Sequence, residues 1–473
     1  MKQKSDAKQR FQAMFPPLLA LTSAHGWNAL WGDCGVRPSY GTVVTVSTNV
    51  DGHGLRGILA AKQLARGTEL ARIPLAAAIT VPRASADDGA LARRLIQAVA
   101  KDTRGPWRTY AAQALGWPAE DGSSHPPLES PGAAMFWSKA EVAELQYPAA
   151  IELVSKLRRR IASLRAPAGS TAAEWAWALA VVHSRSFVLS RSGEAGGAER
   201  ELRALVPFAD LLNHESEPPW RYAAEAQAWE AQGCDEPPQP WRVDGEDIVV
   251  SAAYPCVSGG EVRVPYGLEG NAELLASHGF ILEPNDAEYV TLFDSPAQLV
   301  ASRRDLSEMQ ISKRLALLEA ADAAEAPLAA RPAPLGRSRH LLSSCALLVA
   351  TDVEADAFED LFDAEAGHFV LSPPAWLRPE RKRELEAAAR QLARSVALEE
   401  LADFPTRYEQ DEQQLRDLVA PGGTGLCSTN EEKMKVTARA RAQTALRYRL
   451  GLKRLLRDFA KICGETETAD TAT

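Results

Sequence analysis

The chain lacks the patterns that mark metal clusters, disulfide frameworks and membrane-spanning helices. Its six cysteines are scattered, and no two stand in a CxxC pair. A zinc cluster is therefore not expected, and the scatter favours a reducing compartment over a disulfide framework. The eight histidines show neither an HxxxH nor an HExxH spacing, so we expect no metal. Because no run of about eighteen apolar residues occurs, we also expect no membrane span.

Basic residues are fewer than acidic residues. The 473 residues include 53 lysines and arginines against 62 aspartates and glutamates, which gives a formal net charge of −9. A general nucleic-acid binder is usually basic, so we expect no nucleic-acid partner. The balance is compatible with a soluble enzyme that meets a basic segment of another protein.

The N-terminal segment MKQKSDAKQRFQAMFPPLLALTSAHG places a short apolar run after basic residues. This order is superficially similar to a signal or transit peptide. The apolar positions suit one face of a first helix equally well, and we predict the helix. We expect an intracellular, reducing location in the cytoplasm or nucleus, with a plastid as the alternative. The residues of the predicted helix face are Phe11, Met14, Phe15, Leu18, Leu19 and Leu21.

Up to about residue 300 the sequence mixes strand and helix patterns. Alternating valines and short β-rich runs between turn residues indicate strands, and a proline-rich stretch without a period indicates a loop. A turn at Asp244-Gly245 between two apolar runs indicates a hairpin. We predict strands at 42–80 and 261–264, helices at 88–165 and 171–190, a loop at 217–240 and a hairpin at 241–250.

After residue 300 the pattern becomes helical throughout. The last helix begins at a plausible capping box and continues with apolar residues at three- and four-residue steps. A Pro/Ala-rich tract at 326–335 is predicted to be a connector. The four predicted helices cover 306–325, 339–361, 379–417 and 430–464.

Two segments that lie far apart in the sequence contain side chains suited to a functional site. LVPFADLLNHES (205–216) delivers Asn213 and His214 after an apolar run, and GGEVRVPYG (259–267) delivers Tyr266 at the end of a short strand. NAELLASHGF (271–280) follows directly. Neither motif means much alone, but together they indicate one pocket on which amide, imidazole and phenol groups converge.

These segments resemble the SET-domain methyltransferases, in the branch typified by the Rubisco large-subunit lysine methyltransferase. Further segments resemble the opening strands, the helical insert and the helix that ends in Ser-Arg in that branch. Five segments in the right order and spacing carry the resemblance. They are 205–216, 259–267 taken with 271–280, DGHGLRGILAAKQLARGTELARIP (51–74), the insert made of residues 107–110 and FWSKAEVAEL (136–145), and WAWALAVVHSRSF (175–187).

The resemblance implies an α+β fold of small curved sheets, in which the two signature segments pass one another in a knot-like crossing. The absence of a GxGxxG turn after a strand agrees with this, because a Rossmann-type methyltransferase would usually have one. We expect a SET domain over residues 1–300, with a helical insert at about 85–195. An all-helical domain over 301–473 would hold the protein substrate.

The resemblance also implies S-adenosylmethionine as the methyl donor. Asp51, Gly52 and His53 match the first cofactor segment, although a plain turn is the alternative. Asn213 and His214 match the cofactor pair. Arg185 matches the arginine near the carboxylate end of the cofactor, since a guanidinium suits a carboxylate; a structural ion pair is the alternative.

Tyr266 matches the catalytic tyrosine, next to both the cofactor and the incoming amine. The amine must be neutral, yet a free lysine has a pKa of about 10.4; burial in an apolar channel would lower it. Asp210 and Phe187 are expected on the substrate side, with a turn cap and core packing as their alternatives.

His278 departs from the family pattern. Lysine-methylating relatives usually have a second tyrosine at this position, which helps to line the acceptor pocket. We therefore expect a lysine acceptor first and a histidine acceptor second, as in the actin methyltransferases. A catalytically inactive SET-like scaffold that only binds protein is the rival of another class.

Overall fold

The computed structural model forms two compact units that are interleaved along the chain. Unit 1 comprises Met1–Met135, Lys156–Leu268 and Ser277–Gly279, and unit 2 comprises Phe136–Ser155, Glu269–Ala276 and Phe280–Thr473. The predicted boundary near residue 300 stays a prediction. The structure describes residues 37–38, 43–47, 56–83, 88–101, 106–115, 132–191, 200–215, 240–267, 269–320, 327–363, 368–419 and 430–465.

Among the described residues, three small sheets form the β part of unit 1. The first has the order β1-β4-β10-β9 and contains the predicted hairpin, whose turn residue Gly245 has a positive φ of 62°. The second has the order β2-β3-β11-β8, and the third β5-β7-β6. Their strands are β1 (Arg37–Pro38), β2 (Val44–Ser47), β3 (Gly57–Ala60), β4 (Glu69–Pro74), β5 (Ile79–Pro82), β6 (Phe187–Arg191), β7 (Arg200–Leu205), β8 (Asn213–His214), β9 (Trp241–Asp244), β10 (Asp247–Ser251) and β11 (Glu261–Val264).

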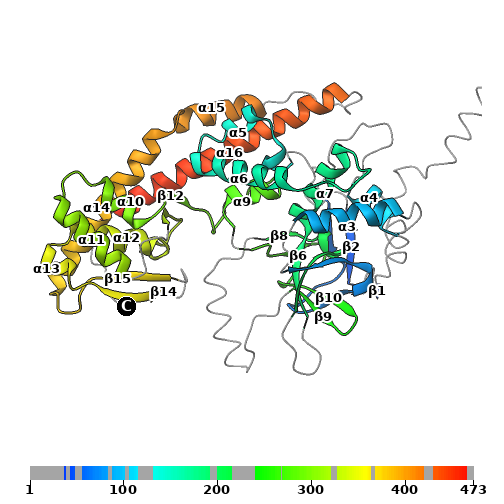
Figure 1. Cartoon of the computed structure of the whole chain (residues 1–473), viewed down its shortest axis with the longest axis horizontal. Coiled ribbons are helices and arrows are strands. Elements are labelled where there is room, and N and C mark those ends of the chain that lie inside the picture. Colours follow the sequence, from blue (N-terminus) through cyan, green and yellow to red (C-terminus); the bar gives the residue numbers. More distant parts are fainter. Residues whose placement is uncertain are drawn as a thin grey trace, which may run out of the picture. The chain divides into compact units, whose positions relative to one another are not determined.

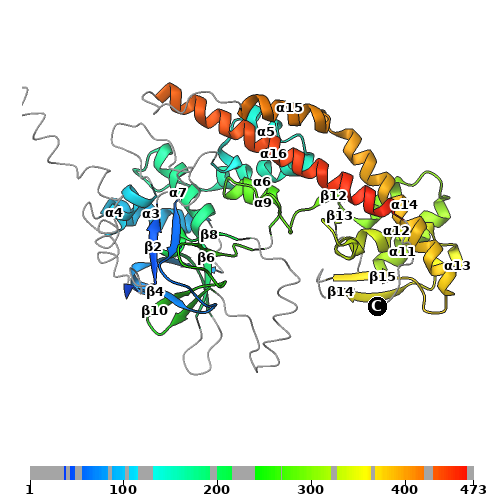
Figure 2. The same ribbon diagram turned by 180° about the vertical axis from the view of Figure 1, so that it is seen from behind.

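Helices pack beside these sheets (Figures 1 and 2). Helix α7 begins with a capping box, in which the side chain of Thr171 accepts from the N–H of Glu174. It ends earlier than predicted, because Phe187–Arg191 pairs with β7 as strand β6. Aromatic and β-branched residues suit such a pleated surface. The helices are α3 (Asp88–Lys101), α4 (Pro106–Ala114), α7 (Ala172–Arg185) and α6 (Pro148–Ser163), the last with residues in both units.

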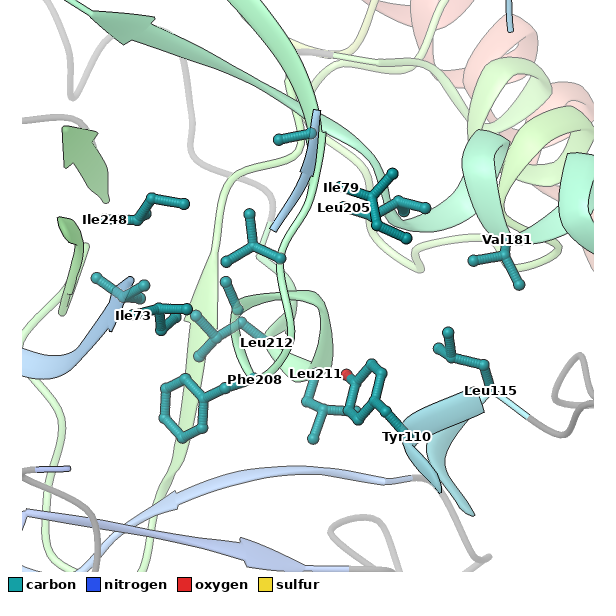
Figure 3. Packing of buried hydrophobic residues seen from close by; sticks show 14 of the residues in the cluster. Ile73, Ile79, Tyr110, Leu115, Val181, Leu205, Phe208, Leu211, Leu212 and Ile248 are labelled. Carbon is teal, nitrogen blue, oxygen red and sulfur yellow. The ribbon is translucent and has the colours of Figure 1, made fainter. Parts of the chain in front are cut away.

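The core of unit 1 surrounds the segment that precedes the Asn-His pair. Phe208, Leu211 and Leu212 are buried there, with Tyr110 of α4 and Ile73 of β4 in the same cluster (Figure 3). Burying this apolar run holds the chain rigidly up to Asn213, which the core therefore positions.

Unit 2 is mainly helical, as predicted. The long helix α16 packs against α14 and α15 (Figure 1). The predicted helices at 339–361 and 379–417 are interrupted, the end of the one at 306–325 lies outside the described residues, and the last matches α16. The helices are α5 (Lys139–Ala143), α9 (Asn271–Ser277, ending in unit 1), α10 (Pro296–Ser302), α11 (Glu308–Ala320), α12 (Arg339–Val349), α13 (Asp352–Ala355), α14 (Pro379–Asp403), α15 (Tyr408–Val419) and α16 (Asn430–Gly464).

Two features of unit 2 correct the prediction of an all-helical part. The Pro/Ala tract contains strand β13 (Leu328–Ala330), which pairs with β12 (Val290–Phe293). Strand β14 (Glu359–Asp363) pairs with β15 (His368–Ser372). The partner of β13 lies far away in the sequence, so the local pattern could not reveal that pairing. Strands β14 and β15 are neighbours in the chain, and their pairing replaces the end of the helix predicted at 339–361.

Within the described ranges no helix is long and apolar enough to cross a membrane. The same residues include no group of three or more His, Cys, Asp or Glu side chains that could hold a metal ion.

Candidate active site

The two signature segments lie side by side in the second sheet of unit 1. Strand β8 runs parallel to β11, with Asn213 opposite Arg263 and His214 opposite Val264. Beyond the strands, the main-chain N–H of Tyr266 donates to Nδ1 of His214 at 3.0 Å. Segments separated by about fifty positions thus lie side by side, and the prediction that they form one pocket stays a prediction.

His214 is held as a neutral imidazole. Because its Nδ1 accepts from Tyr266, its proton must be on Nε2. Burial lowers its pKa to about 4. His214 therefore acts in this site as a fixed, uncharged group rather than as an acid–base catalyst near neutral pH.

The amide of Asn213 links β8 to β11 and to the residue that precedes β3. Its Nδ2 donates to the main-chain oxygen of Arg56 at 2.7 Å and to Oε1 of Glu261 at 2.6 Å. Both amide hydrogens are thus used within the protein. The side-chain oxygen is the group through which Asn213 can accept from a ligand, for which an ammonium is a suitable donor.

Tyr266 is fixed at both ends. Its hydroxyl donates to the main-chain oxygen of Leu212 at 2.7 Å. Its ring lies 5.0 Å from that of His214 at an interplanar angle of 29°, and 5.0 Å from that of His278 at 35°. Since the hydroxyl hydrogen is directed at Leu212, the lone pairs of the phenol oxygen can accept from another group.

His278 is anchored at the end of helix α7. Its Nδ1 lies 3.2 Å from the main-chain oxygen of Ser184, and because a carbonyl only accepts, Nδ1 carries the proton. Burial lowers the pKa of His278 to about 4. The next residue, Gly279, has a φ of 87°, and a Cβ there would lie 2.4 Å from the carbonyl carbon of Gly132. Only glycine fits at position 279. This close backbone packing holds the neighbouring His278 imidazole against Tyr266.

Arg185 and Asp210 are brought together, but through the main chain. Nη1 of Arg185 donates to the backbone oxygen of Asp210 at 2.6 Å. The side chain of Asp210 is buried and accepts from the hydroxyl of Tyr110. Burial raises the pKa of Asp210, although the Arg185 guanidinium opposes the shift. The expected cofactor role of Arg185 and substrate role of Asp210 stay predictions.

The backbone before the Asn-His pair is strained. Phe208 is buried and adopts φ 75° and ψ −51°, which is unfavourable for a residue with a bulky side chain. Strain of this kind occurs at functional sites, where surrounding structure maintains it. Here it turns the chain into η6 (Ala209–Leu211) and then into β8.

Other predicted site residues are less informative. Phe187 stacks on Trp241 with ring centroids 4.2 Å apart, which is the packing alternative, and its place on the substrate side stays a prediction. Asp51, Gly52 and His53 lie outside the described residues.

The residues that support the site were not predicted from the sequence. Glu261 accepts from both Asn213 and Arg263, the latter at 2.6 Å. Tyr110 binds the carboxyl of Asp210. Glu261 and Arg263 alternate with valines in the predicted strand, which signalled one polar face, but nothing in the sequence signalled that Tyr110 would meet Asp210.

Comparisons with known proteins agree with this geometry. Residues 305–456 match the family model of the Rubisco LSMT substrate-binding domain. A crystal structure of the SET domain of LSMT bound to methyllysine and AdoHcy aligns with a TM-score of 0.56 at 20% identity, covering 95% of this chain and 92% of that one. No curated protein sequence matches the chain.

Two further solved structures align similarly. Rubisco LSMT bound to sinefungin and monomethyllysine gives a TM-score of 0.54 at 18% identity, covering 95% of this chain and 92% of that one. Rubisco LSMT bound to AdoMet gives 0.53 at 18% identity, with the same coverage of both chains.

The fold is therefore that of a SET domain combined with a mainly helical C-terminal part. Within this class the chain is similar to Rubisco LSMT, and residues 305–456 carry the substrate-binding domain of that branch. The resemblance predicted from the sequence is confirmed.

Proposed function

We propose that the protein is an S-adenosylmethionine-dependent protein N-methyltransferase, with a lysine side chain as the first candidate acceptor. The observation that carries the proposal is the packing of the Tyr266 ring against the imidazoles of both His214 and His278, beside the strand of Asn213. The fold supports it, since LSMT structures with AdoMet, AdoHcy, lysine and methyllysine share that fold.

The residues present fit the donor. The side-chain oxygen of Asn213 is the acceptor that an amino-acid ammonium requires, and its amide hydrogens are used by Arg56 and Glu261. S-adenosylmethionine, when bound, supplies a methyl group on a sulfonium sulfur, which departs as the neutral thioether of S-adenosylhomocysteine.

Tyr266 would orient the nucleophile. Its hydroxyl is held by Leu212, so the phenol oxygen can accept an N–H of the incoming amine and aim the nitrogen lone pair at the methyl group. The lysine ammonium first gives its proton to solvent, and the neutral nitrogen then forms a bond to the methyl carbon as the sulfur–carbon bond breaks. Alignment of the reacting atoms supplies most of the acceleration in such a site.

A histidine acceptor is the second candidate because of His278. Where a lysine-methylating site would usually have a phenol, this one presents a neutral imidazole, whose Nε2 can only accept. An N–H of a substrate imidazole can donate to it. The mainly helical unit 2, with the substrate-binding match, is our candidate for holding the protein that carries the acceptor.

The test is to incubate the purified chain with methyl-labelled S-adenosylmethionine and a cell lysate, then map the label by mass spectrometry. We expect the label on a lysine ε-nitrogen; a label on an imidazole nitrogen would establish the second candidate. The second measurement is the binding of S-adenosylmethionine by calorimetry. Absence of both transfer and binding would leave the scaffold as the correct interpretation.

A further inference from the structure

The side-chain amide of Asn213 reaches across the second sheet of unit 1. The sheet order places β11 between β3 and β8, and Asn213 lies on β8 opposite Arg263 of β11. Its Nδ2 donates to the main-chain oxygen of Arg56, the residue before β3, at 2.7 Å and to Oε1 of Glu261 on β11 at 2.6 Å. Two separate segments of the chain thus meet the same end of this amide.

The chemistry of these two partners determines which way the amide points. A main-chain carbonyl oxygen has no hydrogen to donate, and neither has a carboxylate. If the amide turned over, Oδ1 of Asn213 would face two acceptors and both hydrogen bonds would be lost. The amide therefore keeps Nδ2 toward Arg56 and Glu261, and its oxygen takes the opposite position.

Glu261 is itself held in place. Its Oε2 accepts from Nε of Arg263 at 2.6 Å, so its two oxygens serve different donors. Arg263 also donates to Oε2 of Glu215 at 3.1 Å. The side chain of Glu261 is 10% exposed, whereas that of Glu215 is 43% exposed. Because it is largely shielded from water, the contact of Glu261 with Asn213 should outweigh the exposed pair of Arg263 and Glu215.

The oxygen of the Asn213 amide is the atom left for a ligand. Among the described residues, none donates a hydrogen bond to this Oδ1. A fixed acceptor favours a donor over another acceptor, and an ammonium is a stronger donor than a neutral group. The amino-acid end of the methyl donor proposed above has both an ammonium and a carboxylate. The orientation of this amide would therefore distinguish the two groups.

We propose that Glu261 is a positioning residue that sets the hydrogen-bonding polarity of Asn213, and that this polarity selects the ammonium of the methyl donor. The inference rests on the proposed function and assigns a role to a side chain that acts only through Asn213. The main-chain oxygen of Arg56 supports the same orientation, but no side-chain substitution removes it. Glu261 is the part of the arrangement that mutation can test.

Glu261→Gln should disturb the polarity without changing the shape. One of the two carboxylate oxygens becomes an NH₂ group, and the cationic Arg263 requires the oxygen that remains. The NH₂ then faces Nδ2 of Asn213, so that a donor meets a donor. The Asn213 amide either loses this contact or turns over, and in both cases the ammonium of a ligand loses a well-placed acceptor.

The experiment is calorimetric titration of the full chain with two ligands that differ in one group. S-adenosylhomocysteine has the ammonium, and its desamino analogue has a hydrogen there but keeps the adenosine, the thioether and the carboxylate. We expect the wild type to bind S-adenosylhomocysteine about tenfold or more tighter than the analogue. Glu261→Gln should weaken the binding of S-adenosylhomocysteine about tenfold and leave that of the analogue unchanged.

Two further variants show the route of the effect. Glu215→Gln is the matched control, because it removes the same charge from the same Arg263 and makes no hydrogen bond to Asn213; it should bind both ligands as the wild type does. Asn213→Ala should lose the preference for the ammonium. Adding Glu261→Gln to Asn213→Ala should then cause no further loss, since Glu261 acts through the amide.

The ratio of the two affinities separates positioning from folding, because a general loss of structure would weaken both ligands alike. Circular dichroism checks that each variant folds. If Glu261→Gln does not fold, Glu261→Asp, which keeps the charge but falls short of Asn213, replaces it, and we expect the same selective loss.

The outcomes distinguish this inference from the proposed function. If the wild type binds neither S-adenosylhomocysteine nor S-adenosylmethionine, the proposed function is wrong and the positioning role falls with it. If the wild type binds S-adenosylhomocysteine but no more tightly than the analogue, the positioning role alone is overturned. The same holds if Glu261→Gln leaves the ratio of the two affinities unchanged.

Discussion

At the residue scale, two uncharged imidazoles flank the phenol of Tyr266. Burial lowers the pKa of both His214 and His278 to about 4, whereas histidine in an unfolded chain titrates near 6.5. The unfolded state therefore binds protons first as the pH falls. The stability that depends on these neutral groups is fully present above pH 6.5 and is lost progressively between about 6.5 and 4.

Replacing His278 should remove part of this acid sensitivity. His278→Asn retains an N–H that can donate to the main-chain oxygen of Ser184, but it does not titrate. Between pH 7.5 and 5, we expect the free energy of unfolding to fall by about 2 kcal/mol less in the variant than in the wild type. Urea unfolding at the two pH values measures this. An equal loss in both proteins would show that His278 is not buried as described.

The buried carboxyl of Asp210 accepts a hydrogen bond from a phenol. Tyr110 donates to it, and both residues are buried. Tyr110→Phe removes the donor with little change of shape, so we expect a loss of about 1–3 kcal/mol in the free energy of unfolding. Denaturant titration measures the loss, and Tyr408→Phe on the half-buried Tyr408 is the control. Wild-type stability in Tyr110→Phe would mean that the carboxyl has another partner.

At the element scale, helix α7 carries Arg185 and Ser184 to the site, and its start is set by Thr171. The side chain of Thr171 accepts from the N–H of Glu174, whose carboxylate accepts from the N–H of Thr171. Thr171→Ala should cost about 1 kcal/mol of stability, and Thr171→Ser, which keeps the hydroxyl, should cost much less. Thermal unfolding compares the two. Equal effects would mean that the cap does not hold the helix.

Helices α15 and α16 are joined by a buried charge cluster. Asp411 is fully buried and faces Arg449 at 2.8 Å and Lys453. Burial lowers the pKa of Lys453, with Asp411 opposing the shift. Asp411→Asn removes the carboxylate that the buried Lys453 contacts and leaves Arg449 only its ion pair with Glu144. We therefore expect a loss of about 3–5 kcal/mol in the free energy of unfolding.

A control for this cluster lies on the same helix. Glu409 pairs with Arg457 at 2.8 Å at the surface. Because exposed ion pairs contribute little, Glu409→Gln should leave the free energy of unfolding nearly unchanged. Chemical denaturation of both variants measures the contrast, and a loss in Asp411→Asn no greater than in the control would contradict the role of the buried cluster.

Elements with a strong local pattern could be predicted from the sequence, and elements that depend on remote partners could not. The period of α16 and the turn of the 241–250 hairpin are local signals, and both predictions are confirmed. The predicted helix at 379–417 is instead broken after Asp403, since Pro405 disfavours helical backbone at the residue before it. Strand β13 exists only because β12 pairs with it.

The site was partly predictable, because its motifs are local signals whereas its contacts depend on remote residues. The motifs specified which side chains would converge, and the β8–β11 pairing brings them together. The Tyr110–Asp210 bond and the orientation of the Asn213 amide depend on residues brought together by tertiary packing. No periodicity or spacing encodes such contacts.

At the scale of the whole molecule, a SET fold supplies a site of neutral polar groups, and a mainly helical unit carries the match to the substrate-binding domain. The fold is shared with LSMT at 20% identity or less in the structures compared. At this level of sequence divergence, the shared fold does not identify which side chain accepts the methyl group. The chemistry of the site therefore has to be tested on this chain, at the phenol on which the proposed transfer depends.

The most direct measurement is the single-turnover rate of methyl transfer from labelled S-adenosylmethionine to the mapped acceptor protein. It compares the wild type with Tyr266→Phe, and with Tyr408→Phe as the control. Loss of the group that orients the nitrogen predicts a fall of about 100-fold or more in Tyr266→Phe and none in the control. Transfer by Tyr266→Phe at the wild-type rate would contradict the account.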